Sequence, residues 1–424
     1  MKLKEMNREQ LVAFHEEAKK EYDEILAKKL SLNMARGKPS AAQLDLALGV
    51  LEALHARFEF ANSKGDDVRN YGIWDGLDSM KSIFSGMIGV PNSQIIIGNN
   101  SSLAVMFDVM VRGVTHGFSG QTPWGRLDKK KWLCPCPGYD RHFGITEYFD
   151  FEMIPIPMLE TGPDMDMVEE LVKDESVKGI WCVPKYSNPT GITYSDETVR
   201  RFAKLQPAAK DFRIMWDNAY CVHDLTDTPD TLLNLWDEAL AEGTEDNVFI
   251  FASTSKITFP GAGVSAMAAS DRNIVDLKRH FTVETIGPDK LNQLRHVLFF
   301  KDIDGVLNIM KGHRELLEPK FRKVGEVLES DVGDLDIATW NMPNGGYFVS
   351  CDVMPGCAKK VFELCRQAGV IITNAGATFP YGKDPNDSNI RIAPSFPPIE
   401  ELEEAIHVFS TCLKLAASEK LLAE

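Results

Sequence analysis

Short apolar runs alternate along the chain with stretches whose apolar positions recur at helical spacing. Seven such runs predict buried strands, at residues 95–97, 132–134, 152–155, 180–183, 214–216, 248–251 and 264–267. Strands that alternate with helices favour a mainly parallel, seven-stranded sheet with helices on both faces. We therefore expect an α/β fold whose ligands bind at the carboxyl ends of the strands.

The two ends of the chain predict a second, smaller α/β unit. Residues 7–30 and 398–415 both read as amphipathic helices, with charged residues between their apolar positions. A chain of 424 residues also exceeds the usual size of a single core. We place the N-terminal part of the small domain at residues 1–70, the large domain at 71–320 and the C-terminal part of the small domain at 321–424.

Composition and charge narrow the class of protein. A formal net charge of −16 argues against a nucleic-acid partner, which needs clustered basic surface. No segment reads as a signal peptide or a membrane span, so we expect a cytoplasmic protein without a membrane partner. The eight cysteines lack metal-site spacing, which favours reduced thiols with neither disulfides nor a bound metal.

Lys256 is the residue that we expect to be catalytic. It follows the apolar run 248–251, among small hydroxyl residues and glycines. Burial and neighbouring positive charge disfavour an ammonium, so such a lysine loses its proton more readily and forms an imine with an aldehyde. Taken alone, a lysine after a strand is more often a solvated strand end.

Polar residues also follow other predicted strands. Asn188 begins an Asn-Pro-Thr-Gly turn, Asp217 ends an apolar strand, Tyr220 comes three residues later, and Arg391 lies in a strand near the C-terminus. Each has an ordinary alternative: a turn asparagine, a helix cap, a core tyrosine and a surface arginine. Parallel strands bring their carboxyl ends to one sheet edge, so Asn188, Asp217 and Lys256 are expected to face one cleft.

Together these residues resemble fold-type I pyridoxal-phosphate enzymes of the class I/II aminotransferase family, and the order that carries the resemblance is Asn188, Asp217, Tyr220, Lys256 and Arg391. Residues 33–39 are similar to the N-terminal substrate loop of that family, and residues 71–77 to its tyrosine-glycine motif. Residues 35–39 and 137–142 resemble the branch that contains type Ic aspartate aminotransferases and MocR-like aminotransferase domains. The resemblance spans nearly the whole chain.

The resemblance implies a pyridoxal 5'-phosphate cofactor. Lys256 would form the imine with its aldehyde, and Asp217 would pair with the pyridinium nitrogen. Asn188 and Tyr220 would hydrogen-bond the ring oxygen, and Tyr139 would stack on the ring.

Phosphate is expected at a helix N-terminus, with candidate contacts from Asn100, Ser101, Ser102, Ser253 and Ser255. Tyr71 is expected to reach the cofactor of a neighbouring subunit in a homodimer with shared active sites. One position departs from the family: Val264 stands eight residues after Lys256, where many relatives have an arginine. Another cation or helix-end amides must then balance the phosphate.

The resemblance assigns substrate binding as well. Arg391 would hold an α-carboxylate through two parallel hydrogen bonds, with help from Asn188 and the Gly37 backbone. Four cations are candidates for a side-chain carboxylate, with no choice made among them: Arg36, Lys38, Arg141 and Lys185. The predicted reaction is ping-pong transamination from aspartate to 2-oxoglutarate. A β-lyase or decarboxylase at the same site, and a non-catalytic sensing domain, are the alternatives.

Overall fold

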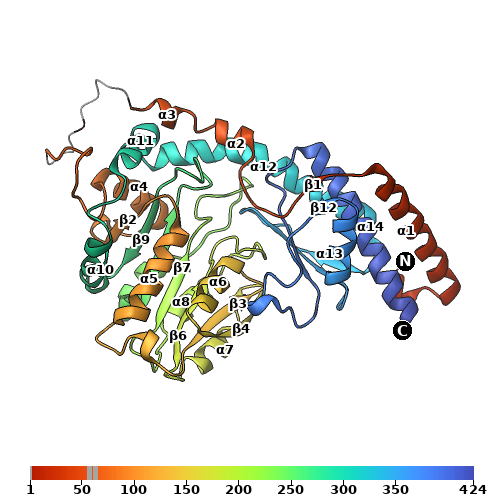
Figure 1. Ribbon diagram of the computed structural model, residues 1–424, viewed down its shortest axis with the longest axis horizontal. Helices are drawn as coiled ribbons and strands as arrows, with labels where there is room; N and C mark the ends of the chain where they lie inside the picture. Colours follow the sequence, from red (N-terminus) through yellow and green to blue (C-terminus); the bar gives the residue numbers. More distant parts are fainter. Residues whose placement is uncertain (1, 55–59, 61–64) are drawn as a thin grey trace.

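An eight-stranded sheet forms the centre of the larger of two units (Figure 1). The computed structural model describes residues 2–54, 60 and 65–424. The strand order is β2-β9-β8-β7-β6-β3-β4-β5. The strands are β2 (Ile95–Ile97), β3 (Lys131–Cys136), β4 (Glu152–Leu159), β5 (Gly162–Pro163), β6 (Val177–Cys182), β7 (Arg213–Asp217), β8 (Val248–Ser253) and β9 (Ser265–Ala269). The seven predicted strands are all present, and the two-residue β5 is added at the edge.

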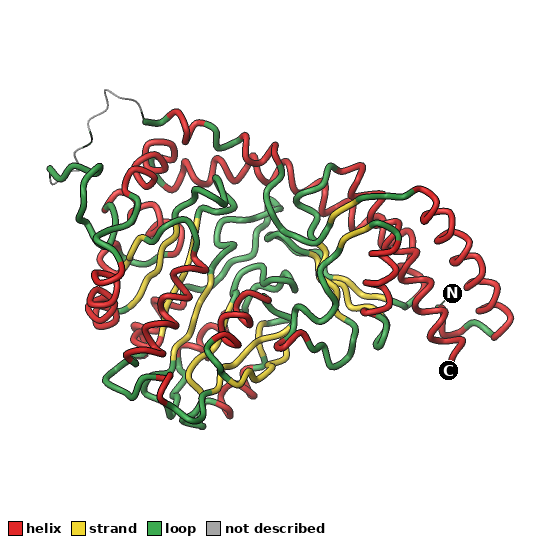
Figure 2. The backbone as a smooth tube through the Cα atoms, in the orientation of Figure 1, coloured by secondary structure: helices red, strands yellow, loops and turns green. Residues whose placement is uncertain are grey.

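Strand direction confirms the mainly parallel sheet. Strands β4, β3, β6, β7 and β8 run parallel to one another, whereas β9 is antiparallel to both β8 and β2. The segments that follow β6, β7 and β8 therefore leave from the same edge of the sheet. Figure 2 shows loops gathered between the two units, where these strands end.

Two helical layers cover the large sheet, because alternate residues of each strand face opposite sides. Trp216 of β7 packs with α4 and α9, whereas Met215 packs in a second cluster with α5 and α6. The helices of this unit are α4 (Asp78–Ile88), α5 (Ser102–His116), α6 (Asp140–Tyr148), α7 (Met165–Leu171), α8 (Asp196–Ala203), α9 (Leu235–Glu242), α10 (Asp271–Glu284) and α11 (Lys290–Phe300).

The smaller unit combines both ends of the chain, as expected. Strand β1 (Leu32–Asn33) pairs with β12 (Val370–Ile371), and an antiparallel sheet has the order β10-β11-β13. Its strands are β10 (Ala338–Trp340), β11 (Val349–Val353) and β13 (Asn389–Ile392). Its helices are α1 (Arg8–Lys28), α13 (Ala358–Gln367) and α14 (Ile399–Ala423), which share one apolar core.

A 30-residue helix, α12 (Ile303–Val332), joins the two units (Figure 1). The proposed boundary at residues 320 and 321 lies inside this helix, and both boundaries stay predictions. Short helices α2 (Ala41–Asp45) and α3 (Gly49–Glu52) precede the large unit. Single 3-10 turns complete the described elements: η1 (Leu3–Glu5), η2 (Asn92–Gln94), η3 (Trp124–Arg126), η4 (Glu245–Asn247), η5 (Gly333–Leu335) and η6 (Pro380–Gly382).

Membrane spans, metal ligands and cysteines can each be checked in the structure of the described residues. No helix in the described part of the chain is long and apolar enough to cross a membrane. Within the same residues, no three His, Cys, Asp or Glu side chains are grouped so that they could hold a metal ion. All eight cysteines are free thiols, and all but Cys221 are buried.

Candidate active site

A cavity of about 270 Å³ lies at the carboxyl ends of β6, β7 and β8. It contains most of the cofactor contacts expected from the sequence: Ser101, Ser102, Tyr139, Asn188, Asp217, Tyr220, Ser253, Ser255 and Lys256. A second opening of about 730 Å³ adjoins it and shares Gly37, Tyr139 and Phe348 with it. Residues that are far apart in the sequence therefore line two adjoining cavities.

Lys256 lies in the loop after β8 with its amine against two aromatic rings. Nζ is 5.0 Å from the ring centre of Tyr220 and 5.8 Å from that of Tyr347. Burial lowers the pKa of Lys256, against an opposing effect from the negative charge of Asp217. The amine therefore loses its proton more readily than a solvated lysine, as a nucleophile or base requires.

Asp217 presents an unpartnered oxygen to the cavity side of β7. The residue is buried, and its Oδ2 lies 3.0 Å from Nε2 of His142. Its Oδ1 is buried without a hydrogen-bond partner. A buried carboxylate oxygen without a hydrogen bond is energetically costly. A hydrogen-bond donor from a ligand, such as a protonated ring nitrogen, would therefore be stabilised beside this atom.

His142 fixes that carboxylate from the far side. Its ring stacks on Trp181, with centroids 4.4 Å apart and an interplanar angle of 11°. The ring of Tyr139 meets it edge-on at 4.9 Å. Both Tyr139 and His142 are positioned by the first turn of α6, so one helix start supplies the aromatic wall and the partner of Asp217.

Two further polar groups in the cavity have hydrogen-bonding capacity to spare. Oδ1 of buried Asn188 accepts from Nη1 of Arg391 at 3.2 Å, which leaves the Nδ2 amide hydrogens. Burial raises the pKa of Tyr220 well above its ordinary value, so its phenol keeps its proton. Asn188 and Tyr220 are therefore both donors that could meet a ligand oxygen.

Hydroxyl groups and a helix start form the opposite end of the cavity. Ser101 is the N-cap of the 15-residue α5, and its side chain makes no capping bond. In contrast, Oγ of Ser255 donates to the backbone oxygen of Asn100 at 2.9 Å. The Asn100 side chain is directed at the oxygen of Gly261, at 3.4 Å, and does not line the cavity.

Lys256 is the one cation among the described residues that line this cavity. Val264, at the position where many relatives have an arginine, is 1% exposed and packs in the apolar core on the α4 side. The N-terminus of α5 points its free backbone amides and partial positive charge at the same space. This end could therefore hold an anion without an arginine at residue 264.

Arg391 lies on β13 and faces the junction of the two cavities. Its Nη1 donates to Oδ1 of Asp140 at 3.0 Å and to Asn188, whereas its Nε is buried without a partner. One edge of the guanidinium is thus anchored. The edge that carries Nε is available to a carboxylate, which matches two parallel donors.

Gly37 lines both cavities, and the space beside it has no room for a larger side chain. A Cβ on this residue would lie 2.5 Å from Cζ of Phe348, which is closer than any side chain tolerates. Glycine therefore allows the segment 35–39 to approach the ring and line both cavities.

The cations proposed for a side-chain carboxylate separate into two groups. Arg36, Lys38 and Arg141 line the larger opening, and Nζ of Lys38 lies 3.8 Å from the Phe396 ring centre. The structure does not bring Lys185 to either cavity, because it is held on the α4 side of the sheet by Asp224 at 2.7 Å. Tyr71, 80% exposed, also lies outside both cavities of its own chain.

The sequence reading missed several residues that shape the site. The resemblance carried by residues 137–142 assigns no role to His142 or Asp140, although a histidine three residues after Tyr139 lies one helical turn away. Tyr347 and Phe348 follow a glycine pair, a pattern that by itself gives neither residue a role in the site. Their approach to Lys256 and Gly37 depends on the packing of the small unit against the large one.

Comparison with known proteins agrees with this geometry. The profile of a family described as aspartate amino-transferase matches residues 6–424. A protein from Mycolicibacterium smegmatis named as a putative aminotransferase is 49% identical over the full length of both chains. The aspartate aminotransferase of Corynebacterium glutamicum is 46% identical over 98% of this chain and 96% of that protein. The crystal structure of an aspartate transaminase from the same organism, 45% identical, superimposes with a TM-score of 0.97 over 99% of both chains.

Proposed function

We propose that this chain, which belongs to the aspartate amino-transferase family, uses pyridoxal 5'-phosphate to transfer the amino group of aspartate to 2-oxoglutarate. One observation carries the proposal: the Lys256 amine and the unpartnered oxygen of Asp217 line one cavity, and Arg391, with its Nε unpaired, lines the cavity that adjoins it. The Lys256 amine can react with an aldehyde, and the Asp217 carboxylate can pair with a protonated ring nitrogen. The Arg391 guanidinium can bind a carboxylate through two parallel hydrogen bonds.

The cavity fits the cofactor at both of its ends. Oδ1 of Asp217 would pair with the ring nitrogen, with His142 holding the carboxylate in place. Asn188 and Tyr220 would donate to the ring oxygen, and Tyr139 would cover the ring face. Ser101, Ser102 and Ser253 would bind phosphate together with the first amides of α5. When bound, the cofactor supplies an electron sink for the electron pair left at the substrate α-carbon.

The remaining steps belong to the residues of this chain. Arg391 would bind the substrate α-carboxylate through the edge that Asp140 and Asn188 leave open. The Lys256 amine, released when the substrate amine takes its place, would then carry the proton away from the α-carbon and deliver it to the cofactor. The lowered pKa of Lys256 suits both duties, because a protonated amine neither attacks nor accepts a proton.

The preference for a dicarboxylic substrate rests on charge and on the relatives. Arg36 and Arg141 line the larger opening, and neither guanidinium has a hydrogen-bond or ion-pair partner among the described residues. Lys38 is the third candidate in that opening. Since the protein carries a net charge of −16, an acidic substrate needs such a locally positive site.

Assembly and location complete the proposal. We expect a cytoplasmic homodimer in which the exposed Tyr71 of one subunit reaches the cofactor phosphate of the other. The substrates, an amino acid and a 2-oxo acid, are then its small-molecule partners. A fully active monomer in analytical ultracentrifugation would remove the role given to Tyr71.

An absorption spectrum of the purified protein tests the main proposal. Aspartate and glutamate should bleach the band of the lysine-linked cofactor and release a 2-oxo acid, whereas alanine and phenylalanine should act weakly. Reduction with borohydride before addition of substrate should label the peptide that contains Lys256. A label elsewhere, or none with saturating cofactor, would contradict the assignment.

The same titration separates the alternatives. A β-lyase would release ammonia and a decarboxylase would release carbon dioxide, and neither would leave the cofactor in its amine form stoichiometrically. A sensing domain would bind amino acids without converting them. Release of the 2-oxo acid with full conversion of the cofactor excludes all three.

A further inference from the structure

Gln43 is a buried amide on the short helix α2, at a point where several hydrogen bonds meet. The residue is 0% exposed. Its Oε1 accepts from the backbone N–H of Ser40 at 3.1 Å, at the start of α2. Its Nε2 lies 2.9 Å from the Tyr347 hydroxyl oxygen and 3.0 Å from Nδ1 of His313. Since an amide nitrogen carries two hydrogens, both contacts can be hydrogen bonds that Gln43 donates.

The two contacts lead to neighbouring carbonyl groups in the loop after β8. The Tyr347 hydroxyl donates to the backbone oxygen of Lys256 at 3.4 Å. Nε2 of His313 lies 2.9 Å from the backbone oxygen of Ile257. A carbonyl oxygen can only accept, so Nε2 of His313 carries the proton and Nδ1 is left to accept from Gln43. Every donor in the two branches therefore meets an acceptor, and both branches end on the loop that carries Lys256.

The protonation states of the two branches suit this arrangement. Burial lowers the pKa of His313, against an opposing effect from its hydrogen bond with the oxygen of Ile257, so the ring is neutral near pH 7. A second proton on Nδ1 would face the hydrogens of Gln43, donor against donor. Burial raises the pKa of Tyr347, so its phenol keeps the proton that it donates.

Three distant parts of the chain meet at this amide. Tyr347 precedes β11 in the small unit, and His313 lies on α12. Next to His313, a Cβ on Gly312 would lie 3.2 Å from the side chain of Leu46, so glycine lets the end of α2 lie close to α12. The chain just before α2, residues 36–38, lines the larger opening. One short segment therefore contacts the substrate end of the site and the supports of the catalytic loop.

We propose that Gln43 is a positioning residue for Lys256, a role that rests on the transaminase function proposed above. Gln43 holds Tyr347 and His313 through its two donated hydrogen bonds, and these two side chains hold the carbonyl groups of residues 256 and 257. Proton transfer is sensitive to small displacements of the base. A fixed backbone therefore keeps the Lys256 amine within reach of the proton that it takes.

Gln43→Met tests this role, because methionine keeps the length and bulk of glutamine but donates no hydrogen bond. Hydrogen exchange of residues 254–260 is measured by mass spectrometry in the cofactor-free protein. The amides of Ile257 and Thr258 both donate to the backbone oxygen of Thr254, so their exchange reports opening of this loop. We expect exchange there to become about tenfold faster in Gln43→Met, with the rest of the chain unchanged.

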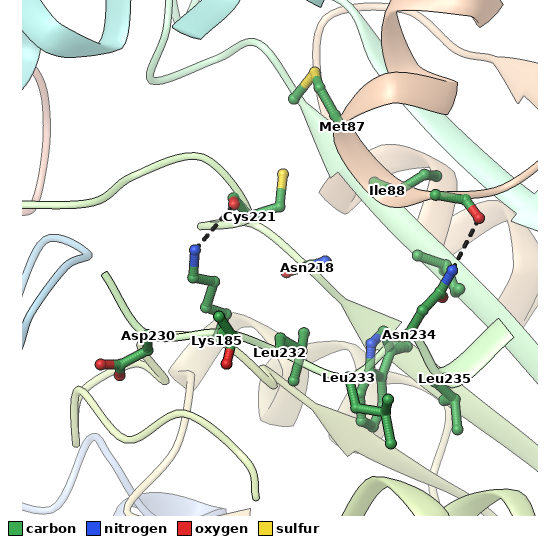
Figure 3. Close-up of a pocket in the computed structure, with 14 residues that line it drawn as sticks. Met87, Ile88, Lys185, Asn218, Cys221, Asp230, Leu232, Leu233, Asn234 and Leu235 are labelled. Carbon is green, nitrogen blue, oxygen red and sulfur yellow. Dashed lines mark hydrogen bonds between the residues drawn. The ribbon is translucent and has the colours of Figure 1, made fainter. Parts of the chain in front are cut away.

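Asn234→Leu is the matched control. Asn234 lines a separate cavity on the α4 side of the large sheet, as Asn218 does (Figure 3). Like the amide on α2, it joins a helix start to a distant segment: it accepts from the backbone N–H of Trp236 and donates to the oxygen of Gly89 at 2.9 Å. The control removes comparable hydrogen bonds elsewhere, so it should leave exchange in the loop after β8 unchanged.

Tyr347→Phe is a second, milder variant. It removes one hydroxyl and keeps the ring beside Lys256, so it disturbs folding least. Exchange of residues 254–260 should become about threefold faster, because only one branch is lost. In the double variant with Gln43→Met it should add less than its effect alone, since the Tyr347 branch acts through Gln43.

A kinetic split checks the consequence for the reaction. In the enzyme loaded with cofactor, Gln43→Met should lower kcat for aspartate by about tenfold. KM and the Kd of the cofactor should stay within about twofold, because Gln43 lines neither cavity. Faster exchange of the loop without a fall in kcat would overturn the proposal, since the position of Lys256 would then not matter for proton transfer.

The exchange measurement has its own contrary outcomes. Unchanged exchange of residues 254–260 in Gln43→Met would overturn the proposal, as would faster exchange over the whole chain or an equal effect of Asn234→Leu. Because this measurement uses the cofactor-free protein, an unaltered protein that fails to transaminate would contradict the proposed function, while exchange still decides whether Gln43 holds the loop. Circular dichroism shows whether each variant has folded, and if Gln43→Met has not, Tyr347→Phe decides by the same criterion.

Discussion

The two ends of the candidate cofactor cavity are built on different physical principles. At the α6 end, one full negative charge on Asp217 is buried, held by His142 and left with an open oxygen. At the α5 end, hydroxyls and backbone amides face the space, and Lys256 is the one cation among the described residues that line the cavity. The α6 end would therefore hold a ligand through a single buried charge, whereas the α5 end would hold it through several weaker dipoles that act together.

The difference predicts how each end responds to mutation. Loss of the single buried charge removes the whole interaction and leaves any ring nitrogen unpaired. Loss of one hydroxyl removes one donor of several, so the rest of the set still holds the phosphate.

Replacement of Asp217 by alanine should have the largest effect. We expect kcat/KM for aspartate to fall on the order of 10³-fold, because a preorganised charge at the reacting ring is lost. Steady-state kinetics with saturating cofactor measure this fall. A loss smaller than about tenfold would mean that Asp217 is not the partner of the ring nitrogen.

Introduction of the family arginine at residue 264 should destabilise the protein rather than strengthen phosphate binding. Val264 is 1% exposed within an apolar core, so Val264→Arg buries an unpaired charge. We expect a loss of about 3 kcal/mol in the free energy of unfolding, measured by urea denaturation. Val264→Ile is the control, with a loss below about 1.5 kcal/mol. Tighter cofactor binding in the arginine variant would contradict the conclusion that residue 264 packs in the apolar core and takes no part in phosphate binding.

Single serines at the α5 end should have graded effects on cofactor affinity. Ser101→Ala should weaken binding of pyridoxal phosphate by about tenfold, the usual value of one hydrogen bond to a charged group. Ser255→Ala is the matched control, because Ser255 already donates to the oxygen of Asn100. Fluorescence titration of the cofactor-free protein measures both. Equal losses in the two variants would show that the free hydroxyl of Ser101 has no special role.

The buried amine of Lys256 should produce the smallest effect, a pH dependence of stability. Its pKa is lowered in the folded protein, so between that pKa and the unfolded value the unfolded chain holds more protons. The stability contributed by the neutral amine therefore rises with pH through this window. In the cofactor-free protein, Lys256→Met should be more stable than the wild type at pH 7, with the difference narrowing toward alkaline pH. Parallel urea-unfolding midpoints across pH would contradict the lowered pKa.

Local patterns predicted much of this molecule. Each of the seven apolar runs became a strand. All of these strands except β4 are buried along nearly their whole length, and burial on both faces of a sheet demands continuous apolar sequence. The placement of Asn188, Asp217 and Lys256 at one edge followed from strand direction alone. The side chains of Asn100 and Lys185, which the sequence proposed as ligand contacts, do not line the candidate active site. A residue near a strand end can face either side of the sheet, so strand position alone does not place its side chain.

The sequence by itself determined the order of strands and helices along the chain and the polar residues at the strand ends. It also carried the resemblance to one enzyme family. Only the tertiary structure decided that His142 holds Asp217, that Tyr347 and Phe348 close the site, and that Asn218 faces a different cavity from its neighbour. The physical reason is that periodicity reports which residues are buried, whereas contacts between distant segments depend on how whole layers pack together.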